Sequence, residues 1–147
     1  MIGLDTSFLV AWAVPEHPQH WECRTLAMET AKQGGTFGLT AGILAEFVHV
    51  VTDPRRFENP LDMDRATALA GFWAAAAEVV HLPQGPEVTA LWLDWLHRHR
   101  LGRKRLLDTL IAATWHHAGI QKVFTLNPAD FNIFDAFTFS PRSSESP

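Results

Sequence analysis

Residues 1–13 read MIGLDTSFLVAWA. This stretch combines a short apolar run with a helical segment, and the same alternation continues along the chain. The apolar run Met1–Asp5 ends in an acid, which predicts a short buried strand with a charge at its carboxyl end. A helix through Phe8 follows at once, and Thr6 and Ser7 are candidate caps for its first turn. A strand that leads directly into a helix is typical of a βαβ crossover, and such crossovers build parallel sheets.

The same alternation of short apolar runs and amphipathic segments continues to the end of the chain. Further strands are predicted at Thr36–Leu39, Glu78–Leu82, Lys122–Leu126 and Phe137–Phe139. Helices are predicted around residues 18–33, 40–53, 62–77, 86–101 and 107–118, although the valines of Phe47–Val51 also suit a strand. We therefore expect one α/β domain over residues 1–140, with a mostly parallel sheet of four or five short strands covered on both faces. Residues 141–147 are expected to form a frayed tail.

Composition limits the class of protein. A chain of 147 residues with 47% hydrophobic and 19% charged residues has the composition of one folded domain. Its single cysteine, Cys23, excludes an internal disulfide and a cysteine-based zinc site, and suits a reducing cytoplasm. No apolar stretch is long enough to span a membrane, and Asp5 interrupts any signal-like start. Because the net charge is −4, a nucleic-acid partner would need a local basic patch or metal ions.

Three acids lie in apolar surroundings where a carboxylate is costly. Asp5 closes the first strand, Glu46 lies among Ile43, Leu44, Phe47 and Val48, and Asp108 opens the apolar helix LLDTLIAATW. Taken singly, Asp108 can be a helix cap and Glu46 an exposed polar residue. Taken together, they converge on the rim of one sheet, which capping does not explain. Clustered carboxylates without cysteine or histidine ligands favour Mg²⁺ or Mn²⁺.

Four blocks of sequence, in order, resemble the PIN domain. They are LDTSFLV with Asp5, LAEFVHVV with Glu46, RKRLLDTLIAATWHHAGI with Asp108, and TLNPADF at Thr125–Phe131. More narrowly, the chain looks like VapC-type toxins of bacterial toxin–antitoxin pairs, over Ile2 to about Phe139. The resemblance implies a three-layer α/β/α fold and an endoribonuclease that depends on Mg²⁺ or Mn²⁺.

The resemblance also implies roles for individual residues. The family's first three acids match Asp5, Glu46 and Asp108, which would be catalytic and hold the metal, and its fourth position matches Asn127. Asp130 is an alternative fourth ligand through water, or else a turn cap. Thr6 and Ser7 match the small hydroxyl beside the first acid, where they would be auxiliary, or they are plain helix caps.

Basic residues gather just before Asp108. Five of the twelve Lys and Arg residues are Arg98, Arg100, Arg103, Lys104 and Arg105. Such a run is usually a solvated surface, but beside an acidic site it can hold RNA phosphates. We therefore expect Arg103, Lys104 and Arg105 to be candidate RNA contacts.

Regulation and two rival functions complete the expectations. The resemblance implies a cognate antitoxin of the VapB type, and we also expect a homodimer. An antitoxin arginine would enter the acidic groove, and Trp12, Phe47 and Val51 would contact an apolar tail. A first alternative is a haloacid-dehalogenase-like phosphatase with Asp5 as nucleophile, although Ser7 stands where that class usually carries a second acid. A second alternative is a non-catalytic relative that binds RNA or protein.

Overall fold

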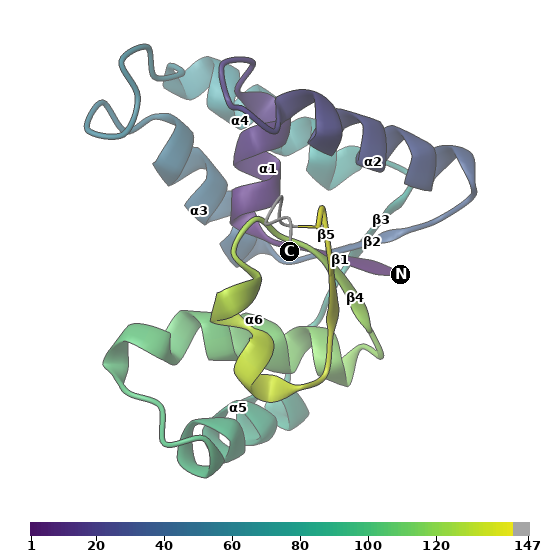
Figure 1. The fold of residues 1–147 in the computed structure, drawn as a ribbon, viewed down its shortest axis with the longest axis vertical. Helices are drawn as coiled ribbons and strands as arrows, with labels where there is room; N and C mark the ends of the chain where they lie inside the picture. Colours follow the sequence, from purple (N-terminus) through teal and green to yellow (C-terminus); the bar gives the residue numbers. More distant parts are fainter. Residues whose placement is uncertain (143–147) are drawn as a thin grey trace.

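The computed structural model describes residues 1–142 and is built on a five-stranded sheet (Figure 1). All neighbouring strands are parallel, and their order is β3-β2-β1-β4-β5. The strands are β1 (Ile2–Leu4), β2 (Phe37–Leu39), β3 (Val79–His81), β4 (Lys122–Phe124) and β5 (Thr138–Ser140). The expected parallel sheet is confirmed, with the larger of the two strand numbers. Most of the predicted tail, from residue 143 onward, lies outside the described residues.

Helices cover both faces of this sheet, which confirms the three-layer α/β/α fold. On one side lie α1 (Thr6–Ala13), α2 (His20–Lys32), α3 (Ala41–Val51) and α4 (Met63–Ala75), and on the other lie α5 (Pro86–Arg98) and α6 (Leu106–His117) (Figure 1). Three short 3₁₀ turns, η1 (Arg103–Arg105), η2 (Pro128–Asp130) and η3 (Asn132–Phe134), connect the elements. None of these helices has the length and apolar character needed to cross a membrane.

The predicted helix over residues 40–53 is confirmed, and the rival strand at Phe47–Val51 is excluded, because Phe47, Val50 and Val51 of α3 are buried at helical spacing. One local prediction is wrong. Thr6 and Ser7 do not cap α1 from outside the helix. They are its first two helical residues, and Asp5 is the N-cap residue. The cap predicted for α3 is present, since the hydroxyl of Thr40 accepts a hydrogen bond from the backbone N–H of Ile43 at 3.2 Å.

Two glycines let helix α6 and its following turn approach the centre of the sheet. A Cβ atom on Gly3 of β1 would lie 2.9 Å from Nε1 of Trp115, and a Cβ atom on Gly38 of β2 would lie 2.6 Å from Cδ1 of Ile120. Trp115 is fully buried and Ile120 nearly so. This close approach fixes α6, and therefore Asp108 in its first turn, against the central strands.

The topology produces a crevice at one edge of the sheet. β1 is flanked by β2 on one side and β4 on the other, so the chain reverses its winding direction between β1 and β4. Open parallel sheets place their binding sites beyond the carboxyl ends of the strands at such a switch point. Asp5 directly follows β1, and Asn127 lies three residues after β4 ends.

Candidate active site

Asp5 is held by hydroxyl groups from two distant segments. Its Oδ2 accepts hydrogen bonds from Oγ1 of Thr125 at 2.6 Å and from Oγ of Ser7 at 2.9 Å. Burial raises the pKa of Asp5 above its ordinary value, and the hydrogen bonds from Thr125 and Ser7 oppose that rise. The charge of Glu46 adds to the upward shift. The carboxylate is therefore oriented by donors on one side and faces other acids on the other.

The same hydroxyl groups connect α1 to the segment after β4. Oγ of Ser7 accepts a hydrogen bond from the backbone N–H of Leu126 at 2.9 Å and lies 3.2 Å from Oγ1 of Thr125. The backbone N–H of Asn127 donates to Oγ1 of Thr125 at 3.0 Å. Ser7 thus occupies the place expected of the hydroxyl beside the first acid, whereas Thr6 makes no such bond to Asp5 among the described residues.

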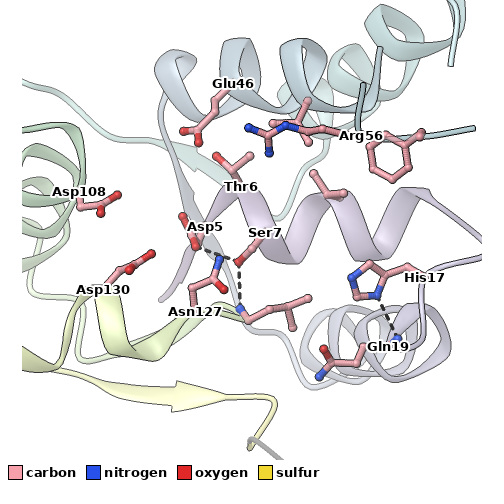
Figure 2. Close-up of a pocket in the computed structure, with 14 residues that line it drawn as sticks. Asp5, Thr6, Ser7, His17, Gln19, Glu46, Arg56, Asp108, Asn127 and Asp130 are labelled. Atoms are coloured by element: carbon pink, nitrogen blue, oxygen red, sulfur yellow. Dashed lines mark hydrogen bonds between the residues drawn. The ribbon is translucent and has the colours of Figure 1, made fainter. Parts of the chain in front are cut away.

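Three acids from separate parts of the sequence face one cavity. Figure 2 shows the carboxylates of Asp5, Glu46 and Asp108 pointing toward a common space, which has a volume of about 470 Å³. Glu46 is carried by α3 and Asp108 by the first turn of α6. Burial raises the pKa of Asp108 to about 6, and the charges of Asp130, Asp5 and Glu46 contribute to the rise. Carboxylates that repel one another in this way are poised to accept a cation.

Both candidates for the fourth position line the same cavity (Figure 2). Asn127 precedes the turn η2, and Asp130 is the last residue of that turn. Among the neighbouring charges, that of Asp130 has the largest effect on the pKa of Asp108. No hydrogen bond from a backbone N–H to the Asp130 side chain is found in residues 1–142, so the geometry does not support a capping role.

The basic residues before Asp108 divide into two groups. Arg103 and Lys104 line a second cavity of about 440 Å³, which is also lined by Asp5, Glu46 and Asp108. Arg105 instead lines neither cavity and contacts the acids from the side of η2 and α6. Its guanidinium donates to the backbone carbonyl of Asp130, and its Nε lies 3.7 Å from Oδ2 of Asp108. Arg105 therefore links η2 to the start of α6 and lowers the pKa of Asp108, opposing the neighbouring acids.

Several residues at the site were not predicted from the sequence. Thr125 is fully buried and makes the shorter of the two hydroxyl contacts to Asp5. Thr125 could have been identified from its position near the carboxyl end of a predicted strand, because Asp5 follows another strand of the same predicted sheet. His17, Gln19 and Arg56 line the larger cavity from loops, where no periodic pattern marks them.

The donor set suits a hydrated hard cation. No three Asp, Glu, His or Cys side chains within residues 1–142 are grouped closely enough to bind one ion directly. The side chains that face the acidic space offer carboxylate and amide oxygens, namely Asp5, Glu46, Asp108, Asn127 and Asp130. Mg²⁺ keeps several of its own waters and needs only one or two direct carboxylate ligands. Oxygen ligands around a cavity of this size therefore fit such an ion together with its own waters.

Comparison with known proteins gives consistent results. The PIN domain family model matches residues 2–135. Ribonuclease VapC24 of Mycobacterium tuberculosis is 24% identical over 140 residues, covering 95% of this chain and 93% of that protein. VapC20 of the same species, described as a toxin that cleaves the sarcin-ricin loop, superposes with a TM-score of 0.72 at 19% identity, over 94% of this chain and 97% of that one. VapBC2 of Rickettsia felis, whose structure includes a promoter DNA fragment, gives a TM-score of 0.64 at 16% identity, over 95% and 97%. The match over nearly the whole length establishes that this chain belongs to the PIN-domain family.

Proposed function

We propose that the chain is a metal-dependent endoribonuclease of the VapC type, acting in the cytoplasm as the toxin of a toxin–antitoxin pair. The observation that carries this proposal is the convergence of Asp5, Glu46 and Asp108 from three separate elements on one cavity at the switch point of a parallel sheet. Membership of the PIN family and the likeness to Ribonuclease VapC24 support the assignment.

The proposed reaction is hydrolysis of an RNA phosphodiester bond. Water adds to the phosphorus atom, the bond from phosphorus to the leaving ribose oxygen breaks, and that oxygen takes up a proton. A bound Mg²⁺ or Mn²⁺ would lower the pKa of a water ligand and neutralise charge on the phosphate. Asp5, Glu46 and Asp108 would hold this cation, and Ser7 and Thr125 keep Asp5 in one rotamer through their two hydrogen bonds.

The fourth ligand in this proposal is Asn127, with Asp130 as the auxiliary residue that acts through water. Both line the cavity, and Asn127 is fixed through its backbone N–H to Thr125. A neutral amide contributes less attraction for a cation than a carboxylate does, so the three acids carry most of the binding. Arg103 and Lys104 lie at the other side of the acids and are proposed to hold RNA phosphates.

Cleavage assays with purified protein test the assignment. Structured RNAs are incubated with Mg²⁺, Mn²⁺ or EDTA, and the cut ends are mapped. Cleavage should require a metal, and Asp5→Asn or Asp108→Asn should reduce it by orders of magnitude. Asp64→Asn is the matched control, because Asp64 also lies in the first turn of a helix but is exposed and lines neither acidic cavity. Full activity of either site variant would refute the assignment.

Assays on the same purified protein distinguish the two alternative functions. A phosphatase of the haloacid-dehalogenase type would form a covalent phosphoenzyme at Asp5, which can be trapped and detected. Because the chain belongs to the PIN family, the sequence no longer supports a phosphatase of the haloacid-dehalogenase type. A non-catalytic relative would bind RNA without cutting it under any metal condition.

We further propose a VapB-type antitoxin as partner and a homodimer as the assembled state. An apolar groove of about 520 Å³ lies between α2 and α4 and is lined by Trp12, Trp21, Met28 and Phe72. Trp21 is 75% exposed and Phe72 58% exposed, so the groove presents apolar surface suited to an amphipathic tail. Of the contacts expected from the sequence, Trp12 lines this groove, whereas Phe47 and Val51 are buried in the core and are excluded.

Inhibition by a co-expressed antitoxin tests the partner. Trp21→Ser should weaken inhibition while leaving cleavage unchanged, because Trp21 lies outside the acidic cavity. Equal inhibition of the variant and the wild type would exclude this groove. Sedimentation equilibrium of the chain alone measures whether it forms the proposed homodimer.

A further inference from the structure

The acidic cluster lies in the middle of a longer trough. The two cavities described above share Asp5, Glu46 and Asp108, so they are two arms that meet at the acids. One arm carries Arg103 and Lys104, which are proposed above to hold RNA phosphates. The other arm, here called the distal arm, is lined by Thr6, His17, Gln19, Arg56 and Phe57, and it has no role so far.

The distal arm contains an arginine side chain that is available to a ligand. Arg56 lies in the loop after α3, and its side chain is 59% exposed. Its one ion pair in residues 1–142 is with Asp53, where Nε lies 3.6 Å from the carboxylate. In Figure 2 the guanidinium of Arg56 points toward the acids, while His17 and Gln19 lie farther along the cavity.

The histidine of the distal arm is fixed as a hydrogen-bond donor. The backbone N–H of Gln19 donates to Nδ1 of His17 at 3.0 Å, so Nδ1 carries no proton and Nε2 carries it in the neutral ring. Burial and the neighbouring His20 lower the pKa of His17, which keeps the ring neutral at physiological pH. His17 therefore offers an N–H group rather than a charge.

A buried hydroxyl between the acids and Arg56 lacks a partner. Thr6 is 5% exposed, lines the cavity, and its Oγ1 makes no hydrogen bond within the described part of the chain. A buried polar group without a partner costs free energy, which a ligand or a water at this position would recover. Its neighbour Ser7 has three hydrogen-bond partners, so the lack of a partner is specific to the Thr6 hydroxyl in this turn.

We propose that the distal arm holds the RNA phosphate that lies beyond the cut, on the side opposite Arg103 and Lys104. Arg56 would bind this phosphate through its guanidinium, with Thr6 and His17 as neutral donors. The three groups donate hydrogen bonds, and phosphate oxygens are acceptors only, so the backbone of a single strand fits better than a base edge. This inference rests on the proposed function and adds that the strand crosses the acids with a cation on each side.

The loop supplies a matched control for the test. Arg55 is the exposed neighbour of Arg56 and has the same charge, but it does not line the cavity. Binding of a fluorescent oligoribonucleotide is measured by anisotropy in EDTA, where no cleavage competes. Arg56→Ala should weaken binding about five- to tenfold and lower the salt slope by about one, whereas Arg55→Ala should change it less than twofold. Arg56→Lys should restore part of the loss, because it keeps charge without the planar fork.

Shortened oligonucleotides then locate the contact. The RNA is trimmed one nucleotide at a time from each end. The effect of Arg56→Ala should vanish when nucleotides on one side of the cut are removed, and the effect of Lys104→Ala when those on the other side are removed. Thr6→Val should weaken binding of the same untrimmed RNA as Arg56→Ala does.

The outcomes separate this inference from the proposed function. Equal binding by the Arg56→Ala and Arg55→Ala variants, or an Arg56→Ala effect that persists after trimming both ends, overturns the distal arm. If the wild-type chain cleaves RNA with none of the metals, but Arg56→Ala still weakens RNA binding, the proposed nuclease activity is refuted and the RNA-binding role of the distal arm is supported. Absence of RNA binding by the wild-type chain overturns both.

Discussion

Replacing Asp108 by asparagine should stabilise the fold in the absence of metal, and the gain should depend on pH. The pKa of Asp108 is raised from 3.8 to about 6 by burial and by the charges of Asp130, Asp5 and Glu46. A raised carboxylate pKa means that the charged form is less favourable in the folded state than in the unfolded chain. The penalty is absent below the unfolded pKa, grows as the pH rises toward 6, and is fully present above it.

The size of the gain follows from the shift. A change of roughly two pKa units corresponds to about 3 kcal/mol at most. The Asp108 side chain is 36% exposed, so solvent screening reduces this to about 1–2 kcal/mol. For a domain of this length, such a gain raises the melting temperature by about 3–6 °C at pH 8.

Thermal unfolding followed by tryptophan fluorescence, in EDTA and at pH values from 4 to 8, measures the effect. Asp64→Asn reports the loss of a favourable first-turn charge on a helix, since Asp64 lies at the start of α4. After subtraction of that control, the gain for Asp108→Asn should be largest above pH 6.5 and small at pH 4. An Asp108→Asn variant no more stable than wild type at pH 8, or a gain independent of pH, would refute the argument from repulsion.

Three further predictions concern activity and packing. The initial rate of RNA cleavage at limiting Mg²⁺ should fall as the pH drops through about 6, because Asp108 takes up a proton. Excess Mg²⁺ should shift this fall to lower pH. A rate that does not change from pH 5 to 8 would contradict the prediction. In metal titrations, Asn127→Asp should raise affinity and Asp130→Asn should cost less activity than Asp108→Asn, and the reverse order for the two aspartates would make Asp130 the fourth ligand. Gly38→Ala should destabilise the fold by about 1–3 kcal/mol in urea unfolding, because its Cβ would lie 2.6 Å from Ile120, whereas Gly71→Ala, with nothing within 4 Å, should stabilise α4 by up to about 1 kcal/mol.

The sequence by itself determined the order of the elements and the residues that carry the acids. Short apolar strands alternate with amphipathic helices, and that pattern allows a parallel sheet with helices on both faces. Asp5 stands out at a strand end, and Glu46 and Asp108 stand out because their sequence neighbours are apolar. In the structure Asp108 is half-buried, whereas Glu46 is exposed at the rim of the cavity. These signals are local, so they can be followed along the chain.

Only the tertiary structure decided which side chains meet. Thr125 donates a hydrogen bond to Asp5 although the two residues lie far apart in the sequence. Arg105 pairs with Asp108, whereas Arg103 and Lys104 line the second cavity. Arg56 reaches the cavity from an irregular loop. Such contacts depend on strand order, on how closely helices pack on the sheet and on the path of the loops. None of these features produces a periodic pattern in the sequence, because they depend on packing between segments that are distant in the chain.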